Sequence, residues 1–203
     1  MDKFKHAFVI TGSIGSGKST VCNILKLYGF KVIDADEISH RVLDDLHGEI
    51  ALEFGLEFVE NGKVLRKKLG NLVFNDKAKM QILENLLHPR IKAEILQTCN
   101  ELEKTQIPYF VDIPLFFEKA NYSEFDKVVV VYAPKEVLIG RISKRNSLTE
   151  SEALVRINLQ IDTEKKRELA NFVIDNSSDF KALNKEIDKF LLTLKSSYKN
   201  LKI

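Results

Sequence analysis

The sequence predicts an α/β fold in which helices flank a five-stranded parallel sheet, with one long helical insertion and a helical lid. Three observations support this prediction. A glycine-rich phosphate-binding loop (P-loop) joins the first apolar strand to a helix. Further apolar runs of strand length alternate with helical patterns. About seventy residues separate the second and third runs, which is too long for a single crossover.

The P-loop spans residues 12–19, Gly-Ser-Ile-Gly-Ser-Gly-Lys-Ser, and fits G-x-x-x-x-G-K-[ST]. An apolar strand precedes it over residues 4–11, and a helix follows over residues 20–28. This order aims backbone N–H groups and the positive end of a helix at one point, which makes an anion site. The pattern assigns Lys18 to the β- and γ-phosphates and the Ser19 hydroxyl to Mg²⁺. We therefore expect binding of a nucleoside triphosphate.

Four more runs have the composition of strands: residues 31–34, 108–113, 127–132 and 171–175. The run 127–132 is apolar from end to end, which is typical of a strand covered on both faces. Parallel strands need crossover connections, and the helical patterns between the runs supply them.

Residues 35–105 form the insertion and have a mostly helical pattern. Pro89 interrupts the pattern of residues 75–103, and we expect a break or kink at His88 because proline lacks an N–H and disfavours helix before it. Ligands of open α/β sheets bind outside the carboxyl ends of the strands, where this insertion emerges. We expect a subdomain for a second substrate, and the alternative is a structural appendage.

Residues 135–169 form a charged helical region, and an amphipathic helix follows over residues 179–199. Arg141, Arg145 and Arg156 lie in the charged region. Forked guanidinium donors suit phosphate oxygens, and in a mobile lid they would close over a nucleotide and neutralise transition-state charge. The alternative is a solvated helix face with local ion pairs.

Three carboxylates are candidates for chemistry. Asp34 and Asp36 follow the second strand. We expect both at the carboxyl end of the sheet, on the same side as the P-loop. One could orient or deprotonate an acceptor hydroxyl or hold water on Mg²⁺, and the other could cap a helix; we favour Asp36 for the chemistry. Asp112 ends the third strand and is a candidate to assist Mg²⁺, with a plain turn residue before Pro114 as the alternative.

Composition gives no support for several classes of function. The chain has 31 Lys and Arg against 29 Asp and Glu, a balance that gives no case for binding nucleic acid or membranes. Cys22 and Cys99 form no C-x-x-C motif, so we expect two small buried side chains, and the four histidines have no metal-ligand spacing. Without a membrane-span or signal-peptide pattern, a cytoplasmic protein acting on small molecules is expected.

Seven segments together resemble one family: residues 11–21, 32–40, 87–91 (Leu-His-Pro-Arg-Ile), 112–118, Arg141-x-x-x-Arg145, Arg156-x-x-x-Gln160 and 170–176. In this order they are similar to the dephospho-coenzyme A kinases, and the resemblance covers nearly the whole chain. The P-loop is shared by many families, whereas the Asp-Ala-Asp, His-Pro and Pro-Leu elements are far more selective.

The family transfers the γ-phosphate of ATP, with Mg²⁺, to the ribose 3′-hydroxyl of dephospho-coenzyme A, the final step of coenzyme A biosynthesis. The resemblance implies a P-loop NTPase fold of the nucleoside-monophosphate-kinase type. Residues 1–203 would form a single kinase domain, with residues 35–105 as the acceptor subdomain and residues 135–169 as the lid.

The resemblance also implies roles for single residues. Asp36 would activate the acceptor, with His88 and Arg90 near it. Arg141, with a catalytic role, and Arg145 would lie in the lid, and the residues that bind ATP would be Gly15, Ser16, Gly17, Lys18, Ser19 and Thr20, with Asn176 near adenine.

Two positions depart from the family pattern. Ser13 stands where the family often has a glycine, and serine accommodates ordinary backbone angles but not a positive φ. Asn171 stands where an aspartate is usual and keeps hydrogen bonding without the charge. The motifs alone also leave open another nucleoside or nucleotide kinase of this fold, and a third hypothesis is a nucleotide switch that acts through a partner.

Overall fold

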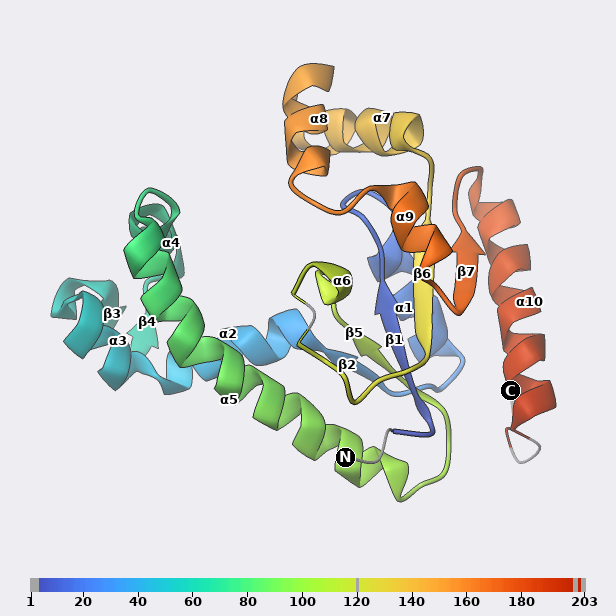
Figure 1. Cartoon of the computed structure of the whole chain (residues 1–203), viewed down its shortest axis with the longest axis horizontal. Helices are drawn as coiled ribbons and strands as arrows, with labels where there is room; N and C mark the ends of the chain where they lie inside the picture. Colours follow the sequence, from blue (N-terminus) through green and yellow to red (C-terminus); the bar gives the residue numbers. More distant parts are fainter. Residues whose placement is uncertain (1–3, 120, 199–200, 202–203) are drawn as a thin grey trace. The chain divides into compact units, whose positions relative to one another are not determined.

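The computed structural model describes residues 4–119, 121–198 and 201, and the chain divides into two compact units (Figure 1). The first unit comprises residues 1–33 and 99–203, and the second comprises residues 34–98.

A five-stranded sheet forms the centre of the first unit, in the order β2-β5-β1-β6-β7. Its strands are β1 (Ala7–Thr11), β2 (Val32–Asp34), β5 (Tyr109–Asp112), β6 (Val128–Tyr132) and β7 (Phe172–Asp175). β1 pairs in parallel with β5 and β6, and β6 pairs in parallel with β7. The three central strands are buried at every position, which explains their continuous apolar sequence. The predicted fold class is confirmed.

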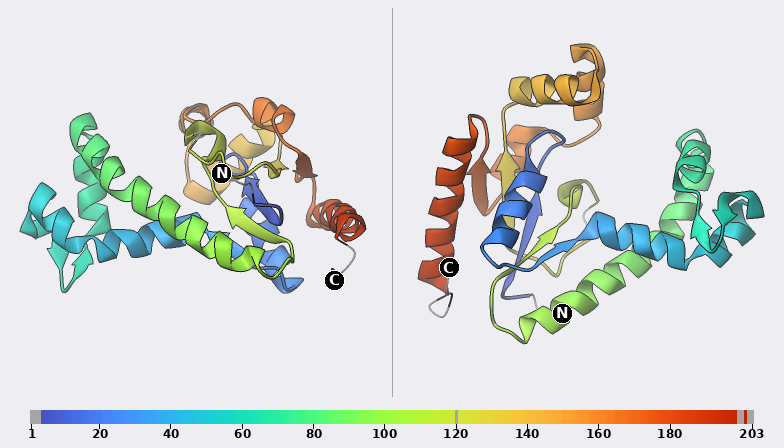
Figure 2. Two further views of the ribbon diagram at one scale, coloured as in Figure 1. Left: turned by 60° about the horizontal axis from the view of Figure 1, so that its bottom comes forward. Right: turned by 180° about the vertical axis from the view of Figure 1, so that it is seen from behind.

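The helices of the first unit are α1 (Lys18–Leu27), α6 (Phe116–Lys119), α7 (Lys135–Asn146), α8 (Glu150–Asn158), α9 (Thr163–Glu168) and α10 (Phe180–Ser197). Apolar residues of α1 and α10 join those of the sheet in one buried cluster, among them Leu25, Phe110 and Ile187. The right-hand view in Figure 2, seen from behind, shows α1 in blue and α10 in red. The predicted last helix is confirmed as far as Ser197, and residue 199 lies outside the described residues.

The second unit consists of short elements and most of one long helix. They are α2 (Ala35–Asp45), α3 (His47–Phe54), the 3-10 helix η1 (Leu56–Phe58), β3 (Val59–Glu60), β4 (Lys63–Val64), α4 (Arg66–Phe74) and α5 (Lys77–Glu103). β3 and β4 form an antiparallel hairpin that was not predicted. Asn61 and Gly62 make its turn with φ values of 51° and 71°, a backbone that Asn-Gly pairs adopt readily.

The expected break before Pro89 is wrong, because α5 is continuous through this residue. A proline at this position removes the hydrogen bond to the carbonyl of Asn85. Both residues are exposed, so water can satisfy that carbonyl, and the cost of proline does not end the helix.

Among the described residues, every helix falls short of the length and apolar character that a membrane span requires.

Glu103, at the end of α5, ties the start of β1 to β5. Its carboxylate accepts from the backbone N–H of His6 at 2.8 Å and from the Tyr109 hydroxyl at 3.1 Å, and it lies 2.9 Å from His6 Nδ1. Burial acts to raise the pKa of Glu103, but the hydrogen bonds from His6 and Tyr109 outweigh it and hold the pKa below its usual value.

Replacement of Glu103 by glutamine is expected to lower the free energy of unfolding by about 1–3 kcal/mol at neutral pH, because charge-assisted hydrogen bonds are lost. The lowered pKa means that the ionised carboxylate stabilises the fold above its ordinary pKa, and that this contribution disappears as the pH falls through the folded-state pKa. Urea unfolding should therefore show a gap between wild type and Glu103→Gln that shrinks below the ordinary glutamate pKa. An equal gap at acid and neutral pH would contradict this account.

Candidate active site

The P-loop connects β1 to α1, which begins at Lys18, two residues before the predicted start. Gly15 and Gly17 have φ values of 82° and 90°, which favour glycine. Non-glycine residues with positive φ in the described chain are Asn61, Gln106 and Ser147. Ser13 is not among them, so serine in place of the usual glycine introduces no backbone strain.

The P-loop packs closely against residues of β6 and of the loop after β7. A Cβ on Gly12 would lie 2.6 Å from the carbonyl oxygen of Val131, and one on Gly17 would collide with the Asn176 amide. The hydroxyls of Ser13 and Ser16 are buried and have no hydrogen-bond partner within the described residues. Unpaired hydroxyls beside a turn of backbone N–H groups suit a ligand rich in oxygen atoms, such as a phosphate chain.

Lys18 forms an ion pair with Asp112, which ends β5. Their side chains are 14% and 8% exposed, so the pair is shielded from solvent. Cys22, one turn further along α1, donates its thiol to Asp112 Oδ2 at 3.4 Å. Burial, together with the charge of Asp112, raises the pKa of Cys22 to about 12, which keeps the thiol protonated and able to donate. The structure thus brings together Lys18 and Asp112 and adds Cys22, which the sequence marked as a buried apolar side chain without a polar role.

Two amide side chains from the C-terminal half hold the P-loop backbone. Asn176, which follows β7, donates from Nδ2 to the carbonyl oxygen of Ser16 at 2.7 Å. Gln160, which follows α8, accepts from the N–H of Ile14 through Oε1 at 2.9 Å. The sequence singled out Asn176 only for adenine, and Gln160 only as part of a motif.

Asn171 also proves to have a structural contact. Its Oδ1 accepts from the Val128 N–H at 2.8 Å, while its own N–H donates to the Val128 carbonyl at 3.0 Å. These bonds fix the start of the β6–β7 pair. The uncharged amide supplies an acceptor oxygen there, as a carboxylate would.

The predicted lid arginines lie on α7 and α8. Arg141 is half-buried, and its Nη2 lies 3.5 Å from the carbonyl oxygen of Ser178, in the loop after β7. Its Nη1 is buried and has no hydrogen-bond partner within the described part of the chain. Arg145 and Arg156 are exposed, and Arg145 donates to the side chain of Asn146 at 3.1 Å. Arg141 therefore reaches the loop that carries Asn176, whereas Arg145 and Arg156 lie at the surface.

Asp34 caps α2. Its Oδ1 accepts from the N–H groups of Asp36 and Glu37 at 2.9 and 3.1 Å. Asp36 lies in the first turn of α2 and is exposed. The capping role thus falls to Asp34, and Asp36 stays the candidate for chemistry.

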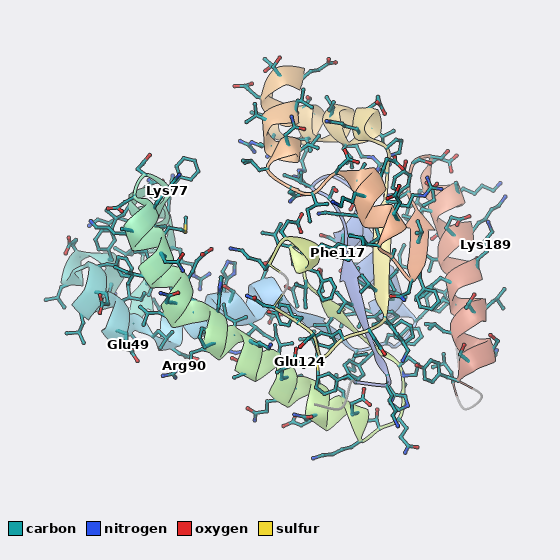
Figure 3. All side chains as sticks on the ribbon, viewed as in Figure 1. Glu49, Lys77, Arg90, Phe117, Glu124 and Lys189 are labelled. Carbon is teal, nitrogen blue, oxygen red and sulfur yellow. The ribbon has the colours of Figure 1, made fainter. Side chains whose placement is uncertain are left out.

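The other predicted acceptor residues lie on α5. His88 Nε2 is 4.0 Å from Glu84 Oε1, and Arg90 is exposed on the helix surface (Figure 3). Asp36, His88 and Arg90 belong to the second unit, and the P-loop and Asp112 belong to the first.

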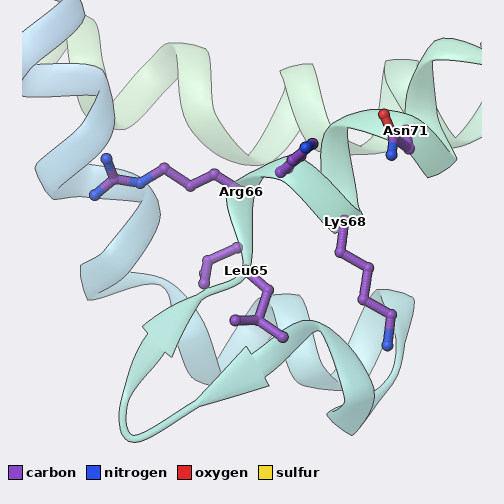
Figure 4. A pocket seen from close by; sticks show the side chains of 6 residues that line it. Leu65, Arg66, Lys68 and Asn71 are labelled. Atoms are coloured by element: carbon purple, nitrogen blue, oxygen red, sulfur yellow. The ribbon is translucent and has the colours of Figure 1, made fainter.

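The second unit carries a surface pocket of about 620 Å³ (Figure 4). Its lining residues are Val64, Leu65, Arg66, Lys67, Lys68 and Asn71. Arg66 forms an ion pair with Asp44 at 2.5 Å, and Lys68 Nζ donates to the carbonyl oxygen of Glu57 at 2.8 Å. The pocket combines apolar surface from Val64 and Leu65 with the positive charge of three side chains.

The parallel sheet, the P-loop between β1 and α1, and the lysine that begins α1 define the class of P-loop nucleoside triphosphate-binding proteins. The family model for dephospho-CoA kinase matches residues 7–182. The chain belongs to the dephospho-CoA kinase family, which confirms the resemblance.

Individual relatives agree with this assignment. Dephospho-CoA kinase of Sulfurimonas denitrificans is 45% identical over 195 residues, covering 96% of this chain and 97% of the relative. Dephospho-CoA kinase of Helicobacter pylori is 44% identical over 192 residues, covering 94% and 98%. The solved structure of dephospho-CoA kinase from Campylobacter jejuni superposes with a TM-score of 0.78 at 40% identity, covering 97% and 99%. These relatives favour a kinase over a nucleotide switch, and a dephospho-CoA kinase over other kinases of the fold.

Proposed function

We propose that this protein transfers the γ-phosphoryl group of ATP to the ribose 3′-hydroxyl of dephospho-coenzyme A, giving coenzyme A and ADP. The observation that carries the proposal is the family match over residues 7–182. Both substrates are small and water-soluble, which fits a cytoplasmic enzyme that works without nucleic acid or membrane.

The P-loop accounts for the nucleotide. Residues Gly15 to Thr20 and the positive end of α1 receive the phosphates, and the unpaired hydroxyls of Ser13 and Ser16 support this role. The ammonium of Lys18 is already placed by Asp112 and exchanges that partner for the β- and γ-phosphates.

The oxygen-rich side chains fit Mg²⁺. Ser19 is exposed at the start of α1, and Asp112 supplies a carboxylate; hydroxyl, carboxylate and phosphate oxygens are the ligands this ion prefers. When bound with ATP, Mg²⁺ would neutralise phosphate charge during transfer. Ser19 would hold it directly, and Asp112 would hold it or its water.

Residues 35–105, which include nearly all of the second unit, are proposed to bind the acceptor. Asp36 orients the 3′-hydroxyl and takes its proton, with His88 and Arg90 assisting in binding. The pocket beside α4 supports this role, because its apolar and cationic side chains match an acceptor with a long uncharged tail and a diphosphate.

The lid, residues 135–169, is proposed to close over the nucleotide. Arg141 neutralises charge in the transition state, and its buried nitrogen without a partner supports this assignment. Arg145 binds phosphate when the lid closes, and Asn176 contacts adenine in addition to holding the P-loop.

Replacement of Arg141 by lysine is expected to lower the turnover about 10- to 100-fold, because an ammonium lacks the forked geometry of the guanidinium. Lys144→Ala, at an exposed position on the same helix, serves as the matched control and should retain the wild-type rate. Steady-state kinetics with both substrates measures the effect. A wild-type rate for Arg141→Lys would instead limit Arg141 to a structural contact with the loop after β7.

Coupled ADP release tests the proposed function. The enzyme is assayed with ATP and Mg²⁺, with and without dephospho-coenzyme A, beside AMP, CMP and adenosine. Stimulation by dephospho-coenzyme A, with a 3′-phosphorylated product by mass spectrometry, is the expected result. Stimulation by one of the other acceptors alone would show that the protein is a kinase with a different acceptor. Tight ATP binding without stimulation by any acceptor would support the nucleotide-switch hypothesis.

A further inference from the structure

The chain returns from the α7–α8 pair to the sheet through residues 160–163, and this return segment is held at three points (Figure 1). The Gln160 side chain accepts from the Ile14 N–H at 2.9 Å. The Ile161 N–H donates to Glu118 Oε1 at 3.1 Å, and the Thr163 hydroxyl donates to the buried carbonyl of Ala133 at 3.2 Å. The return segment is therefore fixed to the P-loop, to α6 and to the end of β6.

A buried ion pair anchors α9, the helix that follows the return segment. Lys166 Nζ lies 2.7 Å from Glu118 Oε1, the same oxygen that accepts from Ile161. The Lys166 side chain is 0% exposed and that of Glu118 is 14% exposed. Separation of such a pair leaves an unpaired buried charge, which is strongly unfavourable. The backbone beside Gln160 is thus held in place independently of Gln160 itself.

The same helical pair also holds the side chain of Ile14. Ile14 packs against a buried cluster formed by Ala133, Leu138, Ile142, Ala153 and Ile157. A Cβ on the next residue, Gly15, would lie 3.0 Å from Ile142 Cγ1, so the P-loop backbone runs close against α7. Ile14 is therefore bound through its side chain by the cluster and through its N–H by Gln160.

Gln160 and Asn176 form opposite kinds of hydrogen bond with the P-loop backbone. Gln160 accepts a backbone N–H, and Asn176 donates to a backbone carbonyl two residues further on. Because Gln160 satisfies the Ile14 N–H, that group is not offered to the phosphates. Further along the P-loop, the Ser16 N–H donates to the Ser13 carbonyl at 3.0 Å, which closes the turn next to Gly17.

We propose that Gln160 is a positioning residue for nucleotide binding: it fixes the Ile14 peptide, holds the P-loop in its receptive conformation and ties that conformation to α7 and α8. Its kinetic consequence rests on the proposed function, whereas the contact itself does not. A neutral side chain suits this position, since a carboxylate would add negative charge beside the phosphate site.

The first test measures hydrogen exchange of the Ile14 amide by NMR in the full-length protein without nucleotide. Gln160→Met keeps the length of the side chain but removes the acceptor, and exchange is expected to be about 10-fold faster. Gln160→Glu keeps the acceptor and should retain the protection. Leu159→Ala is the matched control, because the neighbouring side chain is 80% exposed. Equal exchange in wild type and Gln160→Met would overturn the proposal.

The second test separates positioning from a general loss of structure. Gln160→Met is expected to raise the Kd for ADP and the KM for ATP about 10-fold, with the KM for dephospho-coenzyme A within about twofold of wild type. A parallel rise in both KM values, or none, would overturn the proposal. If wild type fails to phosphorylate dephospho-coenzyme A, the proposed function fails, yet amide exchange and the ADP titration still decide the role of Gln160.

Discussion

Replacing Lys18 with arginine is expected to lower phosphoryl transfer about 10²- to 10³-fold while the protein stays folded. Arginine retains the positive charge that Asp112 needs as a partner. Its planar head is larger than an ammonium and cannot occupy the same point against the β- and γ-phosphates. The measurement is ADP formation in the presence of dephospho-coenzyme A, with thermal unfolding of the same sample.

Lys18→Ala provides the comparison. Transfer is lost here as well, but the buried Asp112 carboxylate is left without its cation, so we expect a loss of about 3–5 kcal/mol in stability. Adding Asp112→Asn to Lys18→Ala removes the unpaired charge and should recover much of that stability without activity. Normal transfer by Lys18→Arg would show that the lysine acts by charge alone, and normal transfer by Lys18→Ala would remove it from catalysis.

Asp36→Asn is expected to lower the turnover about 10²- to 10⁴-fold with little change in the KM for ATP, because an amide cannot accept the proton of the acceptor hydroxyl. Glu37→Gln makes the same change of charge in the same exposed turn and should leave turnover near wild type. Asp34→Asn should keep the cap of α2, because asparagine caps helices as well as aspartate does.

Steady-state kinetics with each substrate varied in turn distinguishes the outcomes for Asp36. Normal turnover of Asp36→Asn would exclude it as a base. A large rise in the KM for ATP would instead assign Asp36 to the nucleotide or its metal ion.

Runs of consecutive apolar residues predicted the strands of the sheet correctly. The central strands are buried on both faces and therefore have a continuous apolar sequence. The same kind of rule failed at Pro89, where exposure of the helix surface lowers the cost of the missing hydrogen bond. The β3–β4 hairpin had a clear local signal in Asn61-Gly62, but each of its strands has two residues and shows no alternation.

The motif identified Lys18 and Ser19, whereas the contacts that shape the P-loop were beyond sequence reasoning. Gln160 is 146 residues from its partner Ile14, and Asn176 is 160 residues from Ser16. Such contacts depend on where two chain segments end after folding, which periodicity does not report. The thiol of Cys22 is a similar case, because its role follows from the neighbouring carboxylate and not from its own burial.

The strand order also has a consequence for the growing polypeptide. β1 is synthesised first and lies at the centre of the sheet, yet its two neighbours, β5 and β6, come after the whole second unit. Residues 34–98 are contiguous, so all the residues of the second unit are available for its internal contacts as soon as residue 98 has been made. β1 pairs with strands that are synthesised only after that unit. β1 is apolar and is buried at every position in the folded protein. Before β5 and β6 have been synthesised, it is therefore an unpaired hydrophobic strand that is prone to aggregation. During translation the second unit is therefore expected to fold before the first, and β1 stays unpaired until β5 and β6 have been synthesised.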